Sequence, residues 1–209
     1  MPEAPPPTAI VLCGGSSRRF GGEKALALVG GRRVIDRVIG VVAPLTGRVI
    51  VVTTAGIAGL GLPAGVEVVA DGFPGTGPLG GICTGLRHTA SGLALVVGGD
   101  LPFLAPGLLR FLLDLAGGHD AVAPRRADGY VQPLHAVYAR ACSPRLEEQL
   151  NGGERAVWRV LAGLRTRYVE PGECLPLDPD GISLFNLNTP EDLERANRIA
   201  AGVDARPPG

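Results

Sequence analysis

Apolar runs and helical patterns alternate along the first 125 residues of the chain. Short runs without polar interruption predict buried β-strands at 8–12, 48–54, 66–70 and 93–97. Apolar periodicity and helix-start signals predict helices at 34–42, 80–89 and 106–116. Apolar strands that alternate with helices are typical of a parallel sheet covered on both faces. We therefore expect an α/β fold with three layers, α/β/α, and a mostly parallel sheet.

The pattern is less regular after residue 125. It predicts strands at 121–124 and 130–138 and a helix at 154–164. Thr189 followed by Pro190, with Asp192 three residues after the threonine, predicts a capped helix start. The chain has 209 residues and shows neither a repeat nor a convincing linker. We therefore expect one domain over 1–209.

Composition and charge narrow the classes of protein. Hydrophobic residues make up 45%, which argues against disorder, and 20 basic residues balance 20 acidic ones. No overall positive field favours nucleic acid, and no apolar run is long enough for a membrane span. The Pro-rich stretch 1–7 lacks the apolar core of a signal peptide. We expect a cytoplasmic protein that binds neither nucleic acid nor membranes.

The four cysteines are scattered, without the spacing of metal ligands. We interpret them as small buried apolar residues in a reducing compartment, with a disulfide-linked secreted domain as the alternative.

The loop at 12–24, with the sequence LCGGSSRRFGGEK, directly follows the first predicted strand. It therefore lies at the carboxyl edge of the sheet, where open α/β folds bind ligands. Glycines let backbone N–H groups approach an anion, and Arg18, Arg19 and Lys24 can balance a triphosphate. The loop matches neither the Walker motif nor the dinucleotide fingerprint. The alternative is an exposed glycine-rich turn with solvated arginines.

This loop resembles the signature LAGGxSxRMGxDK of the molybdenum cofactor guanylyltransferases, with departures at Cys13, Phe20 and Glu23. The resemblance implies a Rossmann-like nucleotidyltransferase fold, with Arg19 and Lys24 among the catalytic residues. Relatives that use CTP carry LAAG instead, so Gly15 favours GTP. The nucleotide-binding residues that it implies in this loop are Leu12, Cys13, Gly14, Gly15, Ser16, Arg19, Gly21 and Lys24.

Asp100 ends the fourth predicted strand within the segment GDLPF. A carboxylate at that edge is well placed to hold Mg²⁺, and the family shows GDxPF here. The alternative is a cap of the following turn. The segment from Asp71 to GPLGG is similar to the family's D…GPLxGI, which places Asp71, Pro78 and Leu79 near the nucleotide. A plain surface loop is the alternative there.

Two further segments match the family. FNLNTPEDL contains Asn186 and Asn188, which point the same way on an extended chain; the family implies that they contact Mg²⁺ or phosphate. Asn188 could instead only help to start the helix. The segments QPLHAVY and GER lie in the half, about 126–201, expected to bind the acceptor, whereas about 8–125 binds nucleotide. They supply the remaining candidates for substrate binding, which are Gln132, Pro133, His135 and Arg155.

Two aromatic side chains near these segments have simpler interpretations. A lone histidine such as His135 is more often structural than functional. Trp158 follows Glu154 at helical spacing, and we expect it in the core, with a stacking platform as the alternative.

The resemblance implies transfer of GMP from GTP to molybdopterin, with or without bound molybdenum, and release of pyrophosphate. Close alternatives are a cytidylyltransferase acting on the same pterin and a sugar- or alcohol-phosphate nucleotidyltransferase. From other classes, we consider a nucleotide-binding module without catalysis and a scaffold for molybdoenzyme maturation that binds apo-enzymes or maturation factors. Lys24, Asp100 and Asn188 occurring together favour an enzyme over a catalytically silent module.

Overall fold

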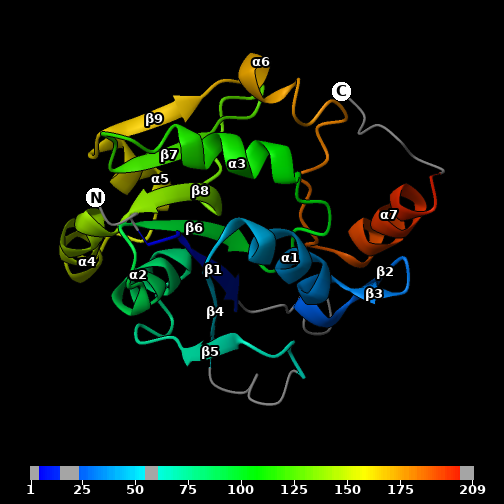
Figure 1. Cartoon of the computed structure of the whole chain (residues 1–209), viewed down its shortest axis with the longest axis horizontal. Helices are drawn as coiled ribbons and strands as arrows, with labels where there is room; N and C mark the ends of the chain where they lie inside the picture. Colours follow the sequence, from blue (N-terminus) through cyan, green and yellow to red (C-terminus); the bar gives the residue numbers. More distant parts are fainter. Residues whose placement is uncertain (1–4, 15–23, 55–60, 203–209) are drawn as a thin grey trace.

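The computed structural model describes residues 5–14, 24–54 and 61–202. Within these segments a seven-stranded sheet has the order β5-β4-β1-β6-β8-β7-β9. Figure 1 shows this ladder from β5 at the bottom to β9 at the top. β8 runs antiparallel to β6 and β7, and all other neighbouring pairs are parallel. The strands are Thr8–Cys13 (β1), Arg48–Thr53 (β4), Val66–Ala70 (β5), Leu93–Gly98 (β6), Ala121–Pro124 (β7), His135–Ala139 (β8) and Thr166–Val169 (β9).

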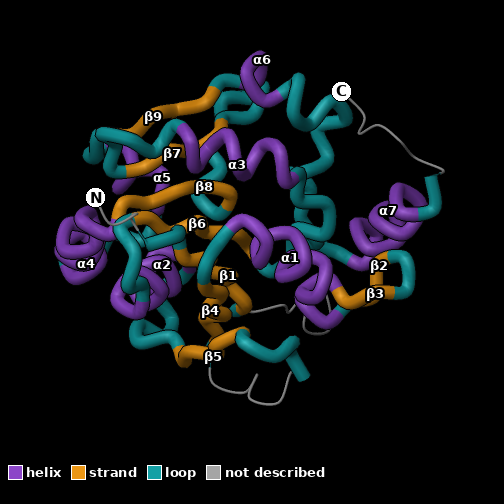
Figure 2. The backbone as a smooth tube through the Cα atoms, viewed as in Figure 1, coloured by secondary structure: helices purple, strands orange, loops and turns teal. Residues whose placement is uncertain are grey.

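Helices cover both faces of this sheet, as the tube in Figure 2 also shows. Because side chains alternate along a strand, Ala9 and Val11 of β1 join one buried cluster and Ile10 joins the other. The expected three-layer α/β/α architecture with a mostly parallel sheet is confirmed. One face carries α1 (Val34–Val42) and α3 (Pro106–Asp114); the other carries α2 (Pro78–His88), α4 (Ser143–Asn151) and α5 (Val157–Ala162). The last helix, α7 (Pro190–Ala200), lies beside the short strand β2 (Leu28–Val29), at the right of Figure 1.

Two predicted elements are shorter than the sequence pattern indicated. The strand expected at 130–138 begins only at His135, because Pro133 has no N–H to donate to a neighbouring strand. The helix expected at 154–164 is α5, which begins at Val157. The carboxylate of Glu154 accepts hydrogen bonds from the N–H groups of Arg155 and Ala156, which holds that segment outside the helix.

Small elements add to this frame and were not predicted. They are the hairpin of β2 (Leu28–Val29) and β3 (Arg32–Arg33), the strand β9, the short helix α6 (Pro171–Cys174) and the 3-10 turns η1 (Lys24–Leu26), η2 (Ala43–Leu45) and η3 (Arg140–Cys142). The predicted start of α7 is confirmed, because Thr189 and Asp192 form a reciprocal capping box.

The strand order reverses between β1 and β6, and ligands of open α/β sheets bind at such a switch point. There the N–H of Gly99, after β6, donates to the carbonyl of Leu12 in β1 at 2.9 Å. A Cβ atom on Gly99 would lie 2.4 Å from the Sγ atom of Cys13, so only glycine permits this approach. The ends of the two strands are thereby held against each other.

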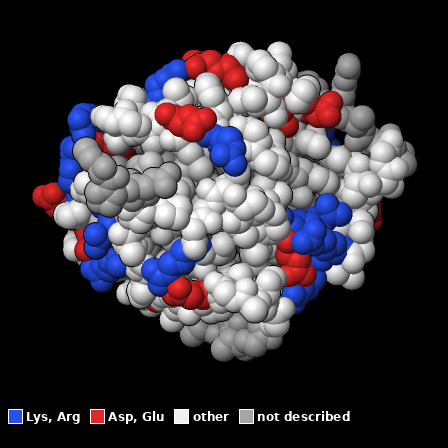
Figure 3. Space-filling model, in the orientation of Figure 1, with Lys and Arg blue, Asp and Glu red and all other residues white. Residues whose placement is uncertain are grey.

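The four cysteines are buried and none is in a disulfide, which confirms their interpretation as small apolar residues. Burial raises the pKa of Cys83 and of Cys142 to about 12, so both thiols stay protonated at neutral pH. Among the described residues, no helix has both the length and the apolar character needed to cross a membrane. On the face shown in Figure 3, basic and acidic side chains lie next to one another rather than in separate patches.

Candidate functional site

A cavity opens at the carboxyl ends of β1, β4 and β6, where the sequence predicted the nucleotide. Its walls come from the ends of these strands, the loop before α2 and η1. We call it the nucleotide cavity. Of the predicted nucleotide-binding residues, the structure brings together Leu12, Cys13, Gly14, Lys24, Asp71, Pro78 and Asp100.

Other predictions for this cavity have different outcomes. The side chain of Leu79 is fully buried in the core beneath α2 and does not line the cavity. Its neighbour Pro78 does, because it stands at the exposed start of that helix. Gly15, Ser16, Arg19 and Gly21 lie outside the described residues.

Sequence reasoning missed several lining residues. Thr53 ends β4 and Thr54 follows it. The place of β4 next to β1 in the sheet could have indicated that both line the cavity. Gly75 and Gly77 precede α2 with φ values of +80° and +72°, which the Gly- and Pro-rich composition of that loop could have indicated.

Three side chains from distant parts of the sequence converge beside the cavity: Lys24 and Asp100 line it, and Asn188 bonds to Lys24. The Nζ atom of Lys24 donates to Oδ1 of Asn188 at 2.9 Å and lies 3.6 Å from Oδ2 of Asp100. All three side chains were predicted to serve the reaction. Two side-chain oxygens, one of a carboxylate and one of a neutral amide, therefore lie near the ammonium of Lys24.

Asp100 is held by its backbone as well as by Lys24. The N–H of Leu187 donates to the carbonyl of Asp100 at 3.0 Å. Leu187 is fully buried, whereas Asn186 and Asn188 on either side of it are exposed, so the two amides face away from the core. Burial raises the pKa of the Asp100 carboxyl, and the charge of Lys24 opposes that shift.

Asp71 occupies the opposite side of the nucleotide cavity, after β5. Its Oδ1 atom accepts hydrogen bonds from the N–H of Phe73 and the hydroxyl of Thr84, both at 2.9 Å. These bonds fix the carboxylate at the edge of the cavity. They also show that Asp71 stabilises the loop before α2, which is a structural role in addition to the predicted contact with the nucleotide.

A second cavity adjoins the first and shares Pro78, Leu134 and Asp100 with it. We call it the acceptor cavity. The predicted substrate-binding residues Gln132, Pro133, His135, Arg155 and Asn186 all line it, together with Trp158. Asn188 does not line it and lies at Lys24 instead.

Trp158 and His135 of the acceptor cavity differ from the sequence-based expectations in their burial and hydrogen bonding. Trp158 is 55% exposed, so its predicted place in the core is wrong: Val157, Val160 and Leu161 fill the buried face of α5 instead. His135 is 1% exposed, and neither of its ring nitrogens has a hydrogen-bond partner among the described residues. A structural histidine at such a site is normally hydrogen-bonded, so this one is unusual.

Comparisons with known proteins agree with this geometry. A family model described as the MobA-like NTP transferase domain matches residues 9–168. A protein of Pelotomaculum thermopropionicum named "Probable molybdenum cofactor guanylyltransferase" is 38% identical over 193 residues, covering 92% of this chain and 93% of the relative. The chain belongs to the family of MobA-like NTP transferases. It is a nucleotidyltransferase of the molybdenum cofactor guanylyltransferase type, as the first loop indicated.

Solved structures extend the comparison to the fold. The crystal structure of molybdopterin-guanine dinucleotide biosynthesis protein A from Archaeoglobus fulgidus is 31% identical, with a TM-score of 0.81, and the match covers 93% of this chain and 99% of that one. A structure of Rv0371C from Mycobacterium tuberculosis in complex with manganese is 20% identical, with a TM-score of 0.69, over 94% of this chain and 100% of that one. The second likeness concerns the fold alone.

Proposed function

We propose that the chain transfers the GMP group of GTP to the terminal phosphate of molybdopterin, with or without bound molybdenum. The observation that carries this proposal is the convergence of Lys24, Asp100 and Asn188 where the nucleotide and acceptor cavities meet. A phosphate oxygen of the pterin would form a bond to the α-phosphorus of GTP. The bond to the β-phosphate would break, and pyrophosphate would leave with the electron pair.

The main task of such a site is to bring two anions together. The nucleophile already carries a negative charge, so the reaction needs no strong general base. The ammonium of Lys24 would hold triphosphate oxygens, and we assign Arg19 and the amides of the first loop to the same task. Positioning of the two reactants would provide the rest.

The same residues fit Mg²⁺. Oδ2 of Asp100 and Oδ1 of Asn188 both face one cationic group, and hard oxygen ligands of this kind suit a small divalent cation. The described residues contain no group of three or more His, Cys, Asp or Glu side chains placed to hold a metal. A magnesium ion that keeps several waters and bridges substrate phosphates needs only one or two carboxylates. When bound, it would neutralise charge that develops on the phosphates.

We assign the two halves of the chain as the sequence suggested. Residues of about 8–125 form most of the nucleotide cavity, and we place the guanine and ribose near Asp71. Residues of about 126–201 form most of the acceptor cavity, where Arg155 is our candidate for the pterin phosphate. The Nη1 atom of Arg155 donates to the backbone carbonyls of Leu150 and Glu154. Among the described residues no carboxylate forms an ion pair with this guanidinium, so its charge is available to a phosphate.

The test is direct. Purified protein is incubated with Mg²⁺, molybdopterin and each of the four nucleoside triphosphates, and the dinucleotide product and pyrophosphate are measured. We expect turnover with GTP to exceed that with CTP, although a change of one methyl group at a base pocket is worth only about 1–3 kcal/mol. A preference for CTP would show a cytidylyltransferase. Binding of an apo-molybdoenzyme without any turnover would show a maturation scaffold instead.

A further inference from the structure

Trp158 stands at the junction of two cavities. It lines the acceptor cavity, and it also lines a third cavity with Arg125 and Tyr168. Val131 is shared in the same way, so the two cavities adjoin at the indole, and we call them together the groove. Because Asp100 also lines the acceptor cavity, this groove runs from the proposed reaction centre to the rim where Trp158 is exposed.

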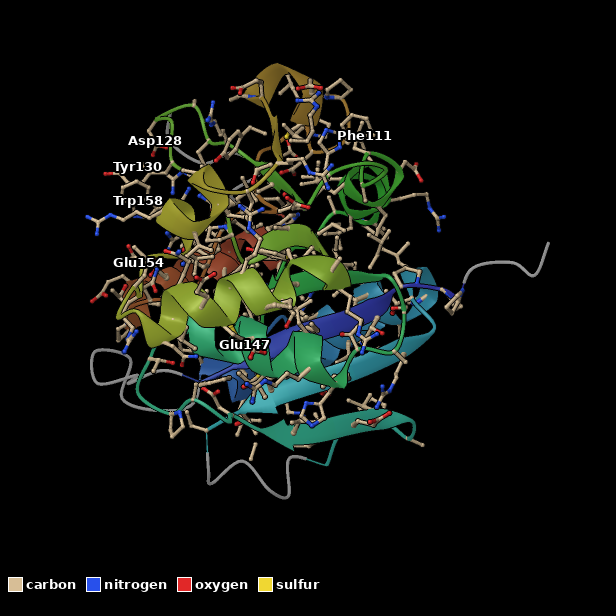
Figure 4. The ribbon with its side chains drawn as sticks, turned by 90° about the vertical axis from the view of Figure 1, so that its left-hand side faces the viewer. Phe111, Asp128, Tyr130, Glu147, Glu154 and Trp158 are labelled. Atoms are coloured by element: carbon tan, nitrogen blue, oxygen red, sulfur yellow. The ribbon has the colours of Figure 1, made fainter. Side chains whose placement is uncertain are left out.

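The indole of Trp158 is exposed to solvent, although it is a large apolar side chain. Figure 4 shows its side chain at the same edge of the molecule as that of Tyr130, which is 72% exposed. The guanidinium of Arg159 lies 5.1 Å from the centre of the indole, and Arg159 also pairs with Glu154. The side chain is thus held at the surface by neighbours on its own segment and is available to a planar ligand in the groove.

His135 gives a second, independent indication of a ligand. It is buried at the acceptor cavity with both ring nitrogens unpartnered among the described residues. Burial lowers its pKa to about 4, so the ring is neutral at physiological pH. A neutral imidazole offers one N–H donor and one acceptor. The side chains of Gln132 and Asn186 in the same cavity also offer both.

Neutral groups that both donate and accept match the edge of a heterocycle better than they match a phosphate. Phosphate is recognised by cations and N–H donors, and an acceptor nitrogen or oxygen repels it. A pterin ring is planar and carries alternating donors and acceptors along its edge. It therefore needs a flat aromatic partner for its face and neutral polar partners for its edge.

We propose that Trp158 is the stacking platform for the pterin ring of the acceptor and that His135 hydrogen-bonds to the edge of this ring. This proposal rests on the proposed function, in which the pterin phosphate reacts where the nucleotide and acceptor cavities meet, at Asp100. The phosphate lies at the Asp100 end of the groove and the ring lies at the Trp158 end. Both side chains then determine specificity for the acceptor and take no part in binding GTP.

The first experiment uses the only tryptophan of the chain as its own reporter. Titration of the whole protein with 6-hydroxymethylpterin or with molybdopterin should quench the emission of Trp158 with saturation, because pterins absorb where tryptophan emits. GTP alone should leave the emission unchanged. Guanylyl transfer without quenching overturns the platform and leaves the proposed function intact. Quenching without transfer supports the platform and overturns the proposed function.

The second experiment separates acceptor binding from nucleotide binding. Trp158→Ala should raise the KM for molybdopterin about tenfold, a typical effect of losing one stacked aromatic ring, with the KM for GTP unchanged. Trp158→Phe should fall between this variant and wild type. Val68→Ala, which truncates a 47% exposed side chain on β5, is the control and should change neither constant. An unchanged KM for molybdopterin in Trp158→Ala, with weaker binding of an apo-molybdoenzyme, would make the groove a protein-docking surface and overturn the proposal.

The third experiment concerns His135. Removing two unpartnered buried nitrogens should not weaken the fold, so His135→Leu should keep or raise the Tm while the KM for molybdopterin rises several-fold. A lowered Tm with an unchanged KM for molybdopterin would show a structural histidine and overturn its part in recognition.

Discussion

Replacement of Asp100 by asparagine tests the site most directly, because it keeps the shape of the side chain and removes its charge. Over the 3.6 Å between Oδ2 of Asp100 and Nζ of Lys24, Coulomb attraction at an effective dielectric constant of about 20 is about 4.6 kcal/mol. The two side chains are 28% and 22% exposed, so solvent weakens this attraction, and we halve it to about 2.3 kcal/mol.

A divalent cation on the same carboxylate has twice the charge, which doubles the discounted value to about 4.6 kcal/mol. Since each 1.36 kcal/mol is about tenfold in rate, Asp100→Asn should lower kcat by a factor on the order of 100 or more. The assay is the formation of dinucleotide at saturating GTP and molybdopterin. Asp114→Asn, which neutralises an exposed carboxylate at the end of α3, is the control and should retain full activity.

The same variant should not lose stability. Burial raises the pKa of Asp100 despite the opposing effect of Lys24, so folding disfavours the ionised carboxylate relative to the unfolded chain. Without ligand at pH 7, asparagine removes this penalty, and the Tm should stay constant or rise. The advantage should shrink as the pH falls through the pKa of Asp100 and the native carboxyl becomes neutral. The bond from Leu187 to the backbone carbonyl survives the substitution.

A different outcome would refute this reasoning. If Asp100→Asn unfolds more readily while its folded fraction turns over normally, the carboxylate is a structural cap and the metal binds elsewhere.

Three further predictions concern separate parts of the molecule. Lys24→Ala should lose most turnover and raise the KM for GTP with little change in far-UV circular dichroism; near-normal kinetics would show that Lys24 does not hold phosphate. Gly98→Ala would place a Cβ atom 2.7 Å from Oδ1 of Asp100, so the carboxylate must shift and kcat should fall about tenfold, whereas Gly92→Ala, with open space around its Cβ, should be silent in the same assay. Because burial lowers the pKa of His135 to about 4 from its ordinary value of 6.5, the unfolded chain takes up a proton first as the pH falls. Wild type should therefore lose up to about 3 kcal/mol of stability between pH 6.5 and 4, measured by urea unfolding, and His135→Leu should lose less; equal losses would place the sensitivity in other groups.

The strands of the first half could be predicted because each is a short apolar run next to a recognisable turn or helix. β5 and α1 match their predicted bounds, and β1, β4 and β6 match within one residue. β9 was missed because its sequence TRYV is only partly buried and its outer positions are polar. The hairpin of β2 and β3 has two residues in each strand, which is too short for a period to be visible.

The lining of the nucleotide cavity could be predicted in part, whereas the contacts between its residues could not. Glycines, a cation and a carboxylate after apolar strands place the nucleotide cavity, because parallel strands end at one edge. The bond of Lys24 to Asn188 joins residues 164 positions apart, and no local pattern encodes it. The prediction for Trp158 was wrong because its spacing from Glu154 has meaning only if both residues lie in one helix. α5 begins three residues later than Glu154, and its buried face is made by Val157, Val160 and Leu161.

The bond between Leu187 and Asp100 has a consequence for the order in which the protein becomes active on the ribosome. All strands of the sheet have been synthesised by Val169, so the sheet can form before the segment with Asn186 and Asn188 leaves the exit tunnel. Lys24 and Asp100 would then face each other without the amide of Asn188. A nascent chain of this length would lack the hydrogen bond from Lys24 to Asn188. Lys24, Asp100 and Asn188 can therefore meet only after the segment 186–188 has reached the folded sheet.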